Sequence, residues 1–287
     1  MKPIPVRNLK TNQNNPDLPE NFSIRILDDV LSGQDMVQDL HRHDYFFILA
    51  LKKGKGNHEI DFTTFQISDH SVFFMRPGQV HKLILKKGSK GFLMQFNPDF
   101  YFPGDKTSSQ LLRMAGSKNI CQPDAGKFNK LIEILGDIFL EYSSKQESYL
   151  EVIKANLGIF FIHLVRHKLG RNNSSGKISQ YSQQRLDEFS ELLETHISTR
   201  KKVSQYSELL HLTPYQLNAI TKSAIGKTGS EFINDFIILE SKRNLLATTN
   251  QINQIAYQLG YDDVSYFIRF FKKHTGYSPE AFRLKFK

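Results

Sequence analysis

The sequence predicts a protein of two domains: an all-β N-terminal barrel followed by a helical pair, and an all-α C-terminal domain with two helix-turn-helix units. Three observations predict this class. Short apolar runs alternate with turn residues from Phe22 to about residue 100, a pattern typical of antiparallel strands. After Pro123 the apolar residues recur at three and four, which is the period of an amphipathic helix. From residue 181 onward the spacing stays helical, and the length of 287 residues exceeds one ordinary domain.

The composition is that of a globular protein with a polyanionic partner. The net charge of +9 favours nucleic acid or an acidic membrane surface. From residue 180 onward, however, fourteen Lys and Arg face eleven Asp and Glu, so the helical pattern, not charge, must carry a DNA-binding prediction. The single cysteine, Cys121, forms no internal disulfide and fits a reducing compartment. Because we find no signal peptide and no long apolar run, we expect a cytoplasmic protein without a membrane partner.

The N-terminal part divides into an arm and a barrel. Residues 1–20 are rich in Asn, Pro and Asp without periodicity, and we interpret them as an N-terminal arm. Residues 21–105 carry evenly spaced short strands, which predict a small antiparallel barrel or sandwich. The expected strands are Tyr45 to Leu51, Glu59 to Phe62, Ser71 to Met75, Leu83 to Leu85 and Phe92 to Phe96.

Two apolar helices and a linker follow. Within residues 106–169 we expect one helix around Phe128 to Phe139 and another from about Ser148 to Leu169. Their apolar faces either pack within the subunit or form the seam of a homodimer, so we name this stretch the helical dimerisation region. Residues 170–180, rich in Gly, Asn and Ser, are predicted to be a linker.

Residues 181–287 are predicted to be all helical. The expected helices are Arg185 to Ile197, Ser204 to Leu210, Pro214 to Ser223, Ser230 to Ala247, Ile252 to Leu259, Val264 to His274 and a last turn near Pro279 to Arg283. Gly260 supplies a turn between two of them. Thr213 is an expected N-cap, and so is Asp263 or, in its place, Asp262. Two recognition helices on one rigid domain would reach two successive major-groove segments of double-stranded DNA.

A spaced motif at the C-terminus carries a family resemblance. Ile255-Ala256, Gly260-Tyr261, Ser265-Tyr266-Phe267, Phe270-Phe271-Lys272-Lys273, Gly276 and Ser278-Pro279 with Phe282-Arg283 resemble the DNA-binding domain of the AraC/XylS family of transcriptional regulators. The resemblance covers roughly residues 180–287. It implies a central helix, about Ser230 to Ala247, that holds the two recognition helices about 34 Å apart.

The same resemblance implies which residues touch DNA. Base-edge contacts would come from Tyr215, Asn218 and Ala219 in the first unit and from Val264, Ser265 and Arg269 in the second, with Gln216 and Ile268 on or near the exposed faces. Arg269 suits guanine and Asn218 suits adenine. Lys222, Lys272 and Lys273 would bind phosphates. Ala219 stands where many relatives have arginine, so the first unit is expected to discriminate bases weakly or by DNA shape.

The N-terminal part resembles the cupin-like sensor domain of that family. His41-Arg42-His43, Gly54 and Pro77-Gly78-Gln79-Val80-His81 carry the match, over about residues 20–100. The candidate effector-binding residues are His41, His43, Tyr45, Phe47, His81 and Phe96. Phe47 stands where metal-binding cupins have a glutamate ligand. Three histidines could still hold zinc, but we expect hydrogen-bonded histidines at a barrel mouth, with no metal and no cofactor.

Together these features predict a regulator, not an enzyme. We expect a sequence-specific DNA-binding transcriptional activator, controlled by a small-molecule effector, that forms a homodimer and contacts RNA polymerase. No nucleophile-base pair or phosphate-binding loop stands out in the sequence. Two alternatives remain open here: a metal-dependent cupin enzyme fused to a helical domain, and a DNA-binding dimer that needs no effector.

Overall fold

The computed structural model describes residues 6–7, 9, 21–101, 106–174 and 180–286, with side chains left undescribed at 106 and 168–180. The chain forms two compact units, residues 5–170 and residues 171–287.

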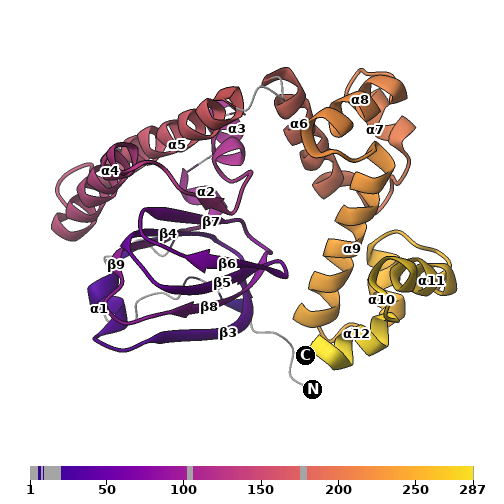
Figure 1. Ribbon diagram of the computed structural model, residues 1–287, viewed down its shortest axis with the longest axis horizontal. Helices are drawn as coiled ribbons and strands as arrows, with labels where there is room; N and C mark the ends of the chain where they lie inside the picture. The colour runs from indigo at the N-terminus through magenta and orange to yellow at the C-terminus, as the bar shows by residue number, and fades with distance from the viewer. Residues whose placement is uncertain (1–5, 8, 10–20, 102–105, 175–179, 287) are drawn as a thin grey trace. The chain divides into compact units, whose positions relative to one another are not determined.

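Two five-stranded sheets build the N-terminal unit (Figure 1). The first has the order β1-β3-β8-β5-β6, in which β1 is parallel to β3 and the other pairs are antiparallel. Its strands are β1 (Val6–Arg7), β3 (Met36–His43), β8 (Val80–Leu85), β5 (Gly56–Ile60) and β6 (Thr63–Ile67). The second has the order β10-β7-β4-β9-β2, made of β10 (Ile120–Cys121), β7 (Ser71–Met75), β4 (Phe46–Lys53), β9 (Lys90–Phe96) and β2 (Phe22–Ile26), all antiparallel.

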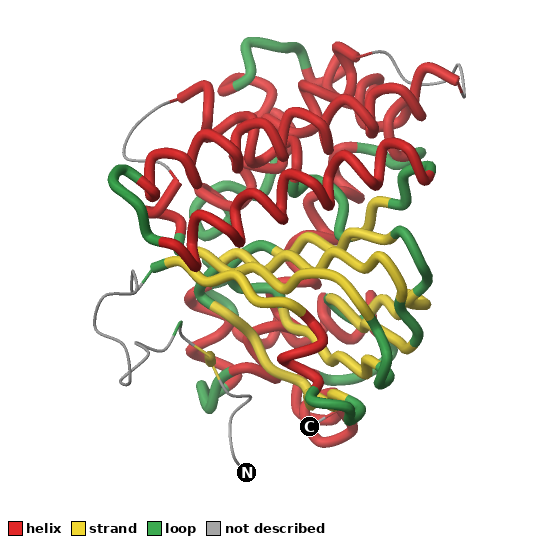
Figure 2. The backbone as a smooth tube through the Cα atoms, turned by 90° about the vertical axis from the view of Figure 1, so that its left-hand side faces the viewer, coloured by secondary structure: helices red, strands yellow, loops and turns green. Residues whose placement is uncertain are grey.

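Apolar side chains on the two faces of the second sheet make two separate cores. Successive strand residues point to opposite faces, and β4 shows the consequence. Phe47 and Leu49 belong to a core shared with the first sheet, whereas Ile48 and Ala50 belong to a core beneath the helices. Figure 2 shows the helices as a separate layer above the strands. A strand buried on both faces explains why β4 is continuously apolar in sequence.

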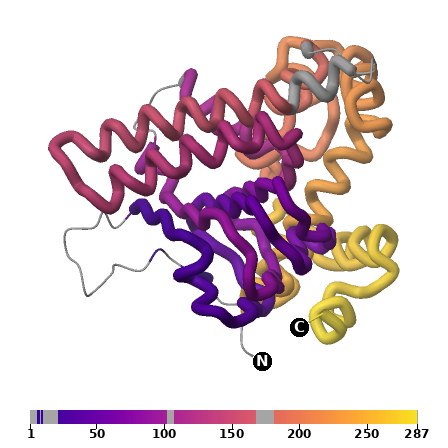
Figure 3. Tube along the Cα trace, turned by 60° about the vertical axis from the view of Figure 1, so that its left-hand side comes forward, coloured from indigo at the N-terminus to yellow at the C-terminus, as the bar shows by residue number. Residues whose placement is uncertain are grey.

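The helical layer consists mainly of α4 (Ala125–Ser144) and α5 (Tyr149–Ser174), which lie side by side in Figures 1 and 3. Asp124 caps α4 by accepting a hydrogen bond from the Lys127 backbone N–H. Phe161 of α5 lies against Phe74 and Phe96 of the sheet. The shorter helices of this unit are α1 (Leu27–Leu31), α2 (Pro98–Tyr101) and α3 (Lys106–Ala115).

Most strand predictions are confirmed, and one is wrong at its end. The run Ser71–Met75 is β7, residue for residue. The strand expected over Glu59 to Phe62 instead ends at Ile60, because Asp61 and Phe62 both have positive φ and form the two-residue turn into β6. Nothing in the apolar pattern distinguishes Phe62 at a turn from a strand residue.

Several elements of this unit were not among the expected strands and helices, and three of them are instructive. Helix α1 lies inside the region expected to be all strand, and α3 precedes the two expected helices. The two-residue strand β10 falls within residues 106–169 but pairs with β7 of the sheet. Strands and helices this short leave too few residues for a period to be recognised. The expected domain boundaries therefore stay predictions, while the sheet extends past residue 105.

The C-terminal unit is all helical, as predicted. It comprises α6 (Gln180–His196), α7 (Val203–Leu209), α8 (Pro214–Ile225), α9 (Gly229–Ala247), α10 (Ile252–Gln258), α11 (Val264–Thr275) and α12 (Pro279–Phe286). Helix α9, with 19 residues, is about 28 Å long. It contacts α7 and α8 as well as α10, α11 and α12, and Figure 1 shows these two groups at its two ends.

The predicted linker differs from the structure at its start. The backbone of residues 170–174 continues α5 to Ser174, and α6 begins at Gln180. A single glycine is tolerated within a helix at about 1 kcal/mol relative to alanine, so Gly170 does not end α5. Residues 175–179 of the predicted linker, and most of the predicted arm over 1–20, lie outside the described residues. Within that arm, Val6 and Arg7 form β1.

Among the helices of the described ranges, none is both long enough and apolar enough to cross a lipid bilayer.

Candidate functional site

Two helix-turn-helix units repeat the same backbone pattern in the C-terminal unit. At the turn after α7, the backbone N–H groups of Leu210, His211 and Leu212 donate to the carbonyls of Tyr206, Glu208 and Ser207. After α10, Leu259, Gly260 and Tyr261 donate to Ile255, Tyr257 and Ala256 in the same arrangement. His211 and Gly260 occupy the equivalent position, with φ of 53° and 70°. The two turns are therefore copies, although one uses histidine where the other uses glycine.

The recognition helices α8 and α11 begin and end alike. The Thr213 hydroxyl accepts from the Gln216 backbone N–H at 3.2 Å, and the Asp263 carboxylate accepts from Ser265 and Tyr266 at 2.8 and 3.1 Å. These caps confirm the sequence prediction. Both helices end at a left-handed glycine, Gly226 or Gly276. Ala219 and Arg269 are thus equivalent positions, as are Lys222 and Lys272.

The outer face of α8 carries most of its predicted contacts. Tyr215 is 83% exposed, and Gln216, Ala219 and Lys222 are also exposed. This face borders a depression of about 500 Å³ that continues onto the start of α9. Its lining residues are Tyr215, Asn218, Ala219, Lys222, Thr228 and Ser230. This surface carries one aromatic ring, Tyr215, and one cation, Lys222. The other lining residues are small and leave space for the edge of a DNA groove.

Asn218, a predicted base contact, binds two backbone groups of this unit through its side chain. Its side-chain Nδ2 donates to the Pro214 carbonyl at 2.9 Å, and its Oδ1 accepts from the Gly229 backbone N–H at 2.8 Å. Bidentate recognition of adenine needs both ends of the amide. Asn218 therefore joins α8 to α9. Its contact with adenine stays a prediction, because each end of the amide can make a second hydrogen bond.

The outer face of α11 is more strongly basic. Ser265, Arg269, Lys272 and Lys273 are exposed, whereas Val264 and Ile268 are half-buried. The Arg269 guanidinium lies 3.8 Å from the Asp263 carboxylate, and both side chains are mostly exposed. An exposed pair at this distance contributes little free energy, so Arg269 is free to turn toward a base. Phe267 and Phe271 anchor the opposite face in the core.

Two cations fasten the second unit to its neighbours, and sequence reasoning did not assign either role. The Lys201 Nζ donates to the Gly260 carbonyl at 2.7 Å and lies over the Tyr261 ring. Burial lowers the pKa of Lys201 below its usual value. Arg283, which belongs to the quoted motif, donates through Nε to the Leu245 carbonyl and through Nη2 to the Asn250 carbonyl. The motif therefore includes Arg283 but does not indicate that its guanidinium binds the Leu245 and Asn250 carbonyls.

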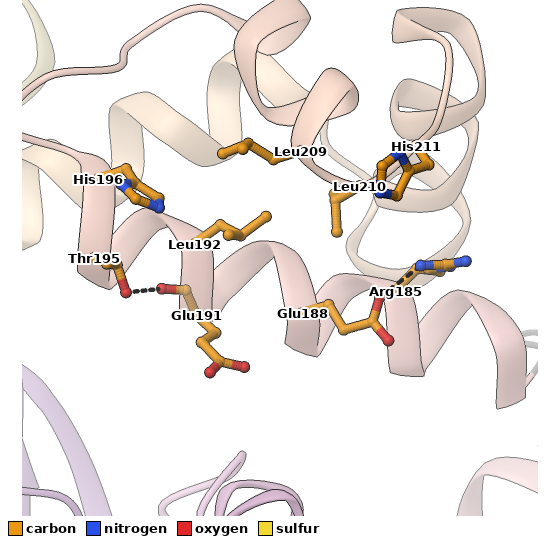
Figure 4. Close-up of a pocket in the computed structure, with 9 residues that line it drawn as sticks. All are labelled: Arg185, Glu188, Glu191, Leu192, Thr195, His196, Leu209, Leu210 and His211. Carbon is orange, nitrogen blue, oxygen red and sulfur yellow. Dashed lines mark hydrogen bonds and ion pairs between the residues drawn. The ribbon is translucent and has the colours of Figure 1, made fainter. Parts of the chain in front are cut away.

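A second depression, of about 390 Å³, lies between α6 and the end of α7 (Figure 4). Its walls combine leucines with Arg185, Glu188 and Glu191, and the Arg185–Glu188 ion pair measures 2.7 Å. None of its lining residues belongs to α8 or α11. With two glutamates at its edge and one arginine already paired, it is poorly suited to a phosphate backbone.

In the N-terminal unit, four buried histidines meet between the sheets. His41 and His43 lie on β3, His81 lies opposite His41 on β8, and His58 lies on β5. The Nε2 of His81 is 2.9 Å from the Nε2 of His41 and 3.2 Å from that of His43. The His81 Nδ1 is 2.8 Å from the His58 Nε2. The structure therefore brings the three predicted histidines together and adds His58, which no motif indicated.

Burial keeps this cluster uncharged. Loss of solvation lowers the pKa of His41 to about 4 and, helped by the neighbouring His41, lowers those of His43 and His58 to about 3. Burial and the surrounding histidines also depress the pKa of His81 strongly. Neutral imidazoles present one lone pair each, which is the form that accepts hydrogen bonds or binds metals.

The three predicted aromatic residues divide between the two cores. The Tyr45 ring stacks on His43 with centroids 4.3 Å apart, and Phe47 lies 5.4 Å from His43 and 5.5 Å from His81. Phe96 points to the other face of the sheet, where it packs on Phe46 and Phe161. Phe96 is therefore not part of this cluster, because residues of β9 alternate between the two faces.

Comparisons with known proteins match both units. Residues 206–285 match a family model described as a helix-turn-helix domain, and residues 31–140 match one described as an AraC-like ligand binding domain. The HTH-type transcriptional activator RhaS of Pectobacterium carotovorum subsp. carotovorum (strain PC1) is 23% identical over 259 residues, covering 85% of this chain and 86% of RhaS. The uncharacterized HTH-type transcriptional regulator YobQ of Bacillus subtilis (strain 168) is 28% identical over 120 residues, covering 40% of this chain. That match spans half the length of YobQ.

Solved structures include two similar chains. ToxT from Vibrio cholerae strain SCE256, with an unsaturated fatty acid bound, is 18% identical with a TM-score of 0.42, and the match covers 94% of this chain and 98% of ToxT. The C-terminal domain of the response regulator yesN from Fusobacterium nucleatum is 28% identical with a TM-score of 0.32, covering 34% of this chain and 95% of that domain. The two family models fall on the barrel and on the paired helix-turn-helix units, so this chain belongs to the AraC/XylS family, which is a family of transcriptional regulators and not of enzymes.

Proposed function

We propose that this protein is a sequence-specific DNA-binding activator that acts as a homodimer under the control of a small-molecule effector. The observation that carries the proposal is the repeat of α8 and α11. Two capped helices present exposed polar and basic faces and are fastened to the two ends of one central helix, α9. Each would enter one major-groove segment of the same duplex.

Base contacts in this proposal come mainly from α11. Arg269 would bond guanine O6 and N7, the commonest specific contact, while Ser265 and the half-buried Val264 and Ile268 would contact neighbouring base edges. On α8, Tyr215, Gln216 and Ala219 face outward, and the small Ala219 leaves this helix with no cation at the position of Arg269. The first unit would therefore contribute less to sequence discrimination than the second.

Phosphate contacts come from the lysines. Lys222 and Lys272 hold equivalent places on the two recognition helices, and Lys273 lies beside Lys272. A lysine that neutralises a phosphate releases about 0.9 counterions from B-DNA. These residues would set the orientation of the protein without selecting a sequence.

The effector would enter the interior of the N-terminal unit near His41, His43, Tyr45, Phe47 and His81. These buried side chains combine aromatic surface with neutral imidazoles, which suits a small, partly apolar ligand. Strand β1 pairs with β3 at His43, so a ligand there would act on the strand that holds Val6 and Arg7. This coupling is part of the proposal.

A homodimer through the helical layer is supported by exposed apolar residues. Leu140 on α4 is 65% exposed, and Ile159 on α5 is 45% exposed, with Val152 and Ile162 on the same helix also exposed. The alternative, that all apolar residues of this pair pack within the subunit, does not account for these four. Activation is supported by the similarity to RhaS, which is named a transcriptional activator, and we propose that an activator of this kind contacts RNA polymerase.

The proposal is tested by selecting duplexes from a randomised library with the full chain, then placing the selected sequence before a promoter for transcription with purified RNA polymerase. We expect a motif of two blocks one helical turn apart and increased transcript.

For the effector, a library of small organic molecules is screened by thermal shift. A ligand at a hundred times its Kd should stabilise the N-terminal unit by about 2.7 kcal/mol, and Phe47→Trp should abolish the shift. A ligand that raises the melting temperature of the wild type and of Phe47→Trp by the same amount binds elsewhere.

A further inference from the structure

Three imidazole nitrogens converge on one point inside the N-terminal unit. One ligand nitrogen from each of His41, His43 and His81 lies within 4.8 Å of the other two, and two of the Nε2–Nε2 distances are 2.9 and 3.2 Å. Around a tetrahedral zinc ion with Zn–N bonds of about 2.0–2.1 Å, neighbouring nitrogens are about 3.3 Å apart. An ion would therefore need only a small outward movement of the rings.

The strand register, and not a flexible loop, produces this convergence. His41 and His81 are direct partners across β3 and β8, and His43 lies two residues further along β3, on the same face. The pairing of β3 with β8 is irregular between Gln38 and His41, which is the signature of a β-bulge. Asp39 lies within that irregular stretch, and its carbonyl oxygen is bonded by His41 Nδ1 at 2.6 Å.

Proton placement shows that the histidines by themselves are poorly satisfied. A carbonyl can only accept, so His41 carries its proton on Nδ1 and its Nε2 presents a lone pair. A proton on His81 Nε2 can point at His41 or at His43, but not fully at both. Among the described residues, His43 Nδ1 has no hydrogen-bond partner. Whether this nitrogen carries the proton or a lone pair, it is left unsatisfied. A cation at the centre would use all three Nε2 lone pairs at once.

Outer partners are already in place for two of the three rings. Metal-bound histidines almost always donate their second N–H to a carbonyl or another acceptor, which fixes the ring. His41 donates to the Asp39 carbonyl, and His81 Nδ1 faces His58 Nε2 at 2.8 Å. The third ring, His43, is held instead by stacking on Tyr45. Phe47 packs against both His58 and His81, so the group lies at the edge of the apolar core between the sheets.

We propose that His41, His43 and His81 bind one divalent ion of the borderline class, Zn²⁺ or in its place Co²⁺ or Ni²⁺, and that His58 positions His81 from behind. Imidazole donors suit these ions better than Mg²⁺ or Ca²⁺, which prefer oxygen. Three protein ligands leave a fourth position for water or another small donor. The site shares its three histidines with the proposed effector site, but the metal proposal rests on their geometry alone and not on the regulatory function.

The first experiment measures metal content of the full chain, purified without a histidine tag, stripped with a chelator and dialysed against Zn²⁺. We expect one zinc per chain by mass spectrometry of the elements, and a higher melting temperature of the zinc-loaded protein. His41→Gln and His43→Gln should each lose the zinc, and His58→Gln should weaken binding by about 10–100-fold. His163→Gln, at a half-buried histidine of α5, is the matched control and should bind like wild type.

A second measurement keeps the test decisive if a glutamine variant fails to fold. Co²⁺ added to the stripped wild-type chain should give the intense visible absorption of a tetrahedral ion, and imidazole NMR signals of three histidines should shift together. Well-folded wild type that holds less than a tenth of an equivalent of zinc would overturn the proposal. So would unchanged zinc in a folded His41→Gln/His43→Gln protein, because the ion would then lie elsewhere. DNA selection is read out separately, so failure of either proposal is distinguishable from failure of the other.

Discussion

The side-chain oxygen of Asn218 accepts a 2.8 Å hydrogen bond from the backbone N–H of Gly229. This bond joins the recognition helix α8 to the first residue of the central helix α9. The same amide donates through Nδ2 to the Pro214 carbonyl one turn back, so both ends of the amide hold backbone groups. Asn218 therefore fixes the orientation of α8 relative to α9. We expect its effect on DNA binding to be indirect, through this orientation.

Replacing Asn218 should cost stability without changing base preference. We expect Asn218→Ala to lower the free energy of unfolding of the C-terminal unit by about 1–2 kcal/mol, because the backbone N–H of the buried Gly229 loses its partner. Denaturant unfolding of the full chain, followed by circular dichroism, measures this change. If stability is unchanged and one base position in the selected motif becomes degenerate, Asn218 contacts DNA after all.

Gly260 should be far less replaceable than Gly276, although both are left-handed glycines. A Cβ added at Gly260 would lie 1.7 Å from the Ser198 carbonyl oxygen, whereas at Gly276 it would meet open space. Gly276→Ala should therefore cost only about 1–2 kcal/mol from backbone strain. Gly260→Ala adds a clash with backbone and should unfold the second unit or displace it from Lys201. Thermal unfolding of the two variants side by side checks the difference, and equal losses would contradict the close packing at this turn.

A charge on the exposed apolar face of α5 should disrupt the proposed dimer. Ile159→Lys is expected to convert dimers to monomers at micromolar concentration in sedimentation experiments, because a charged side chain is costly to bury in an interface. Val37→Lys is the control, since Val37 is 62% exposed on β3 of the same unit. If the protein stays dimeric with Ile159→Lys but becomes monomeric with Val37→Lys, the dimer interface includes β3 and not α5.

The sequence predicted the recognition helices well because their signals are local. Thr213 before Pro214 and Asp263 before Val264 mark helix starts through capping bonds that span three residues. The strands of the barrel were predicted for the same reason, by alternation and turn residues. Two kinds of feature were missed: elements too short to show a period, such as α1 and β10, and contacts between distant segments, which no local period encodes.

Three residues show what could not be predicted. Phe96 belongs to an apolar strand buried on both faces, so its sequence does not tell which core it enters. His58 has no motif and joins the histidine cluster only through the pairing of β5 with β8. Asn218 has the right chemistry for adenine, but Gly229, eleven residues away, captures its amide. In each case the partner is fixed by tertiary packing.

The central claim is that α11 selects sequence through Arg269 while the lysines bind phosphate. The decisive measurement is selection from a randomised duplex library by wild type, Arg269→Ala and Lys272→Ala, with the affinity of each titrated against salt. We expect Arg269→Ala to relax one block of the motif, with a loss of about 1–3 kcal/mol of discrimination and little change in salt slope. Lys272→Ala should keep the motif and reduce the slope by about 0.9. A wild-type protein that selects no motif, or an Arg269→Ala variant with an unchanged motif, would contradict the assignment.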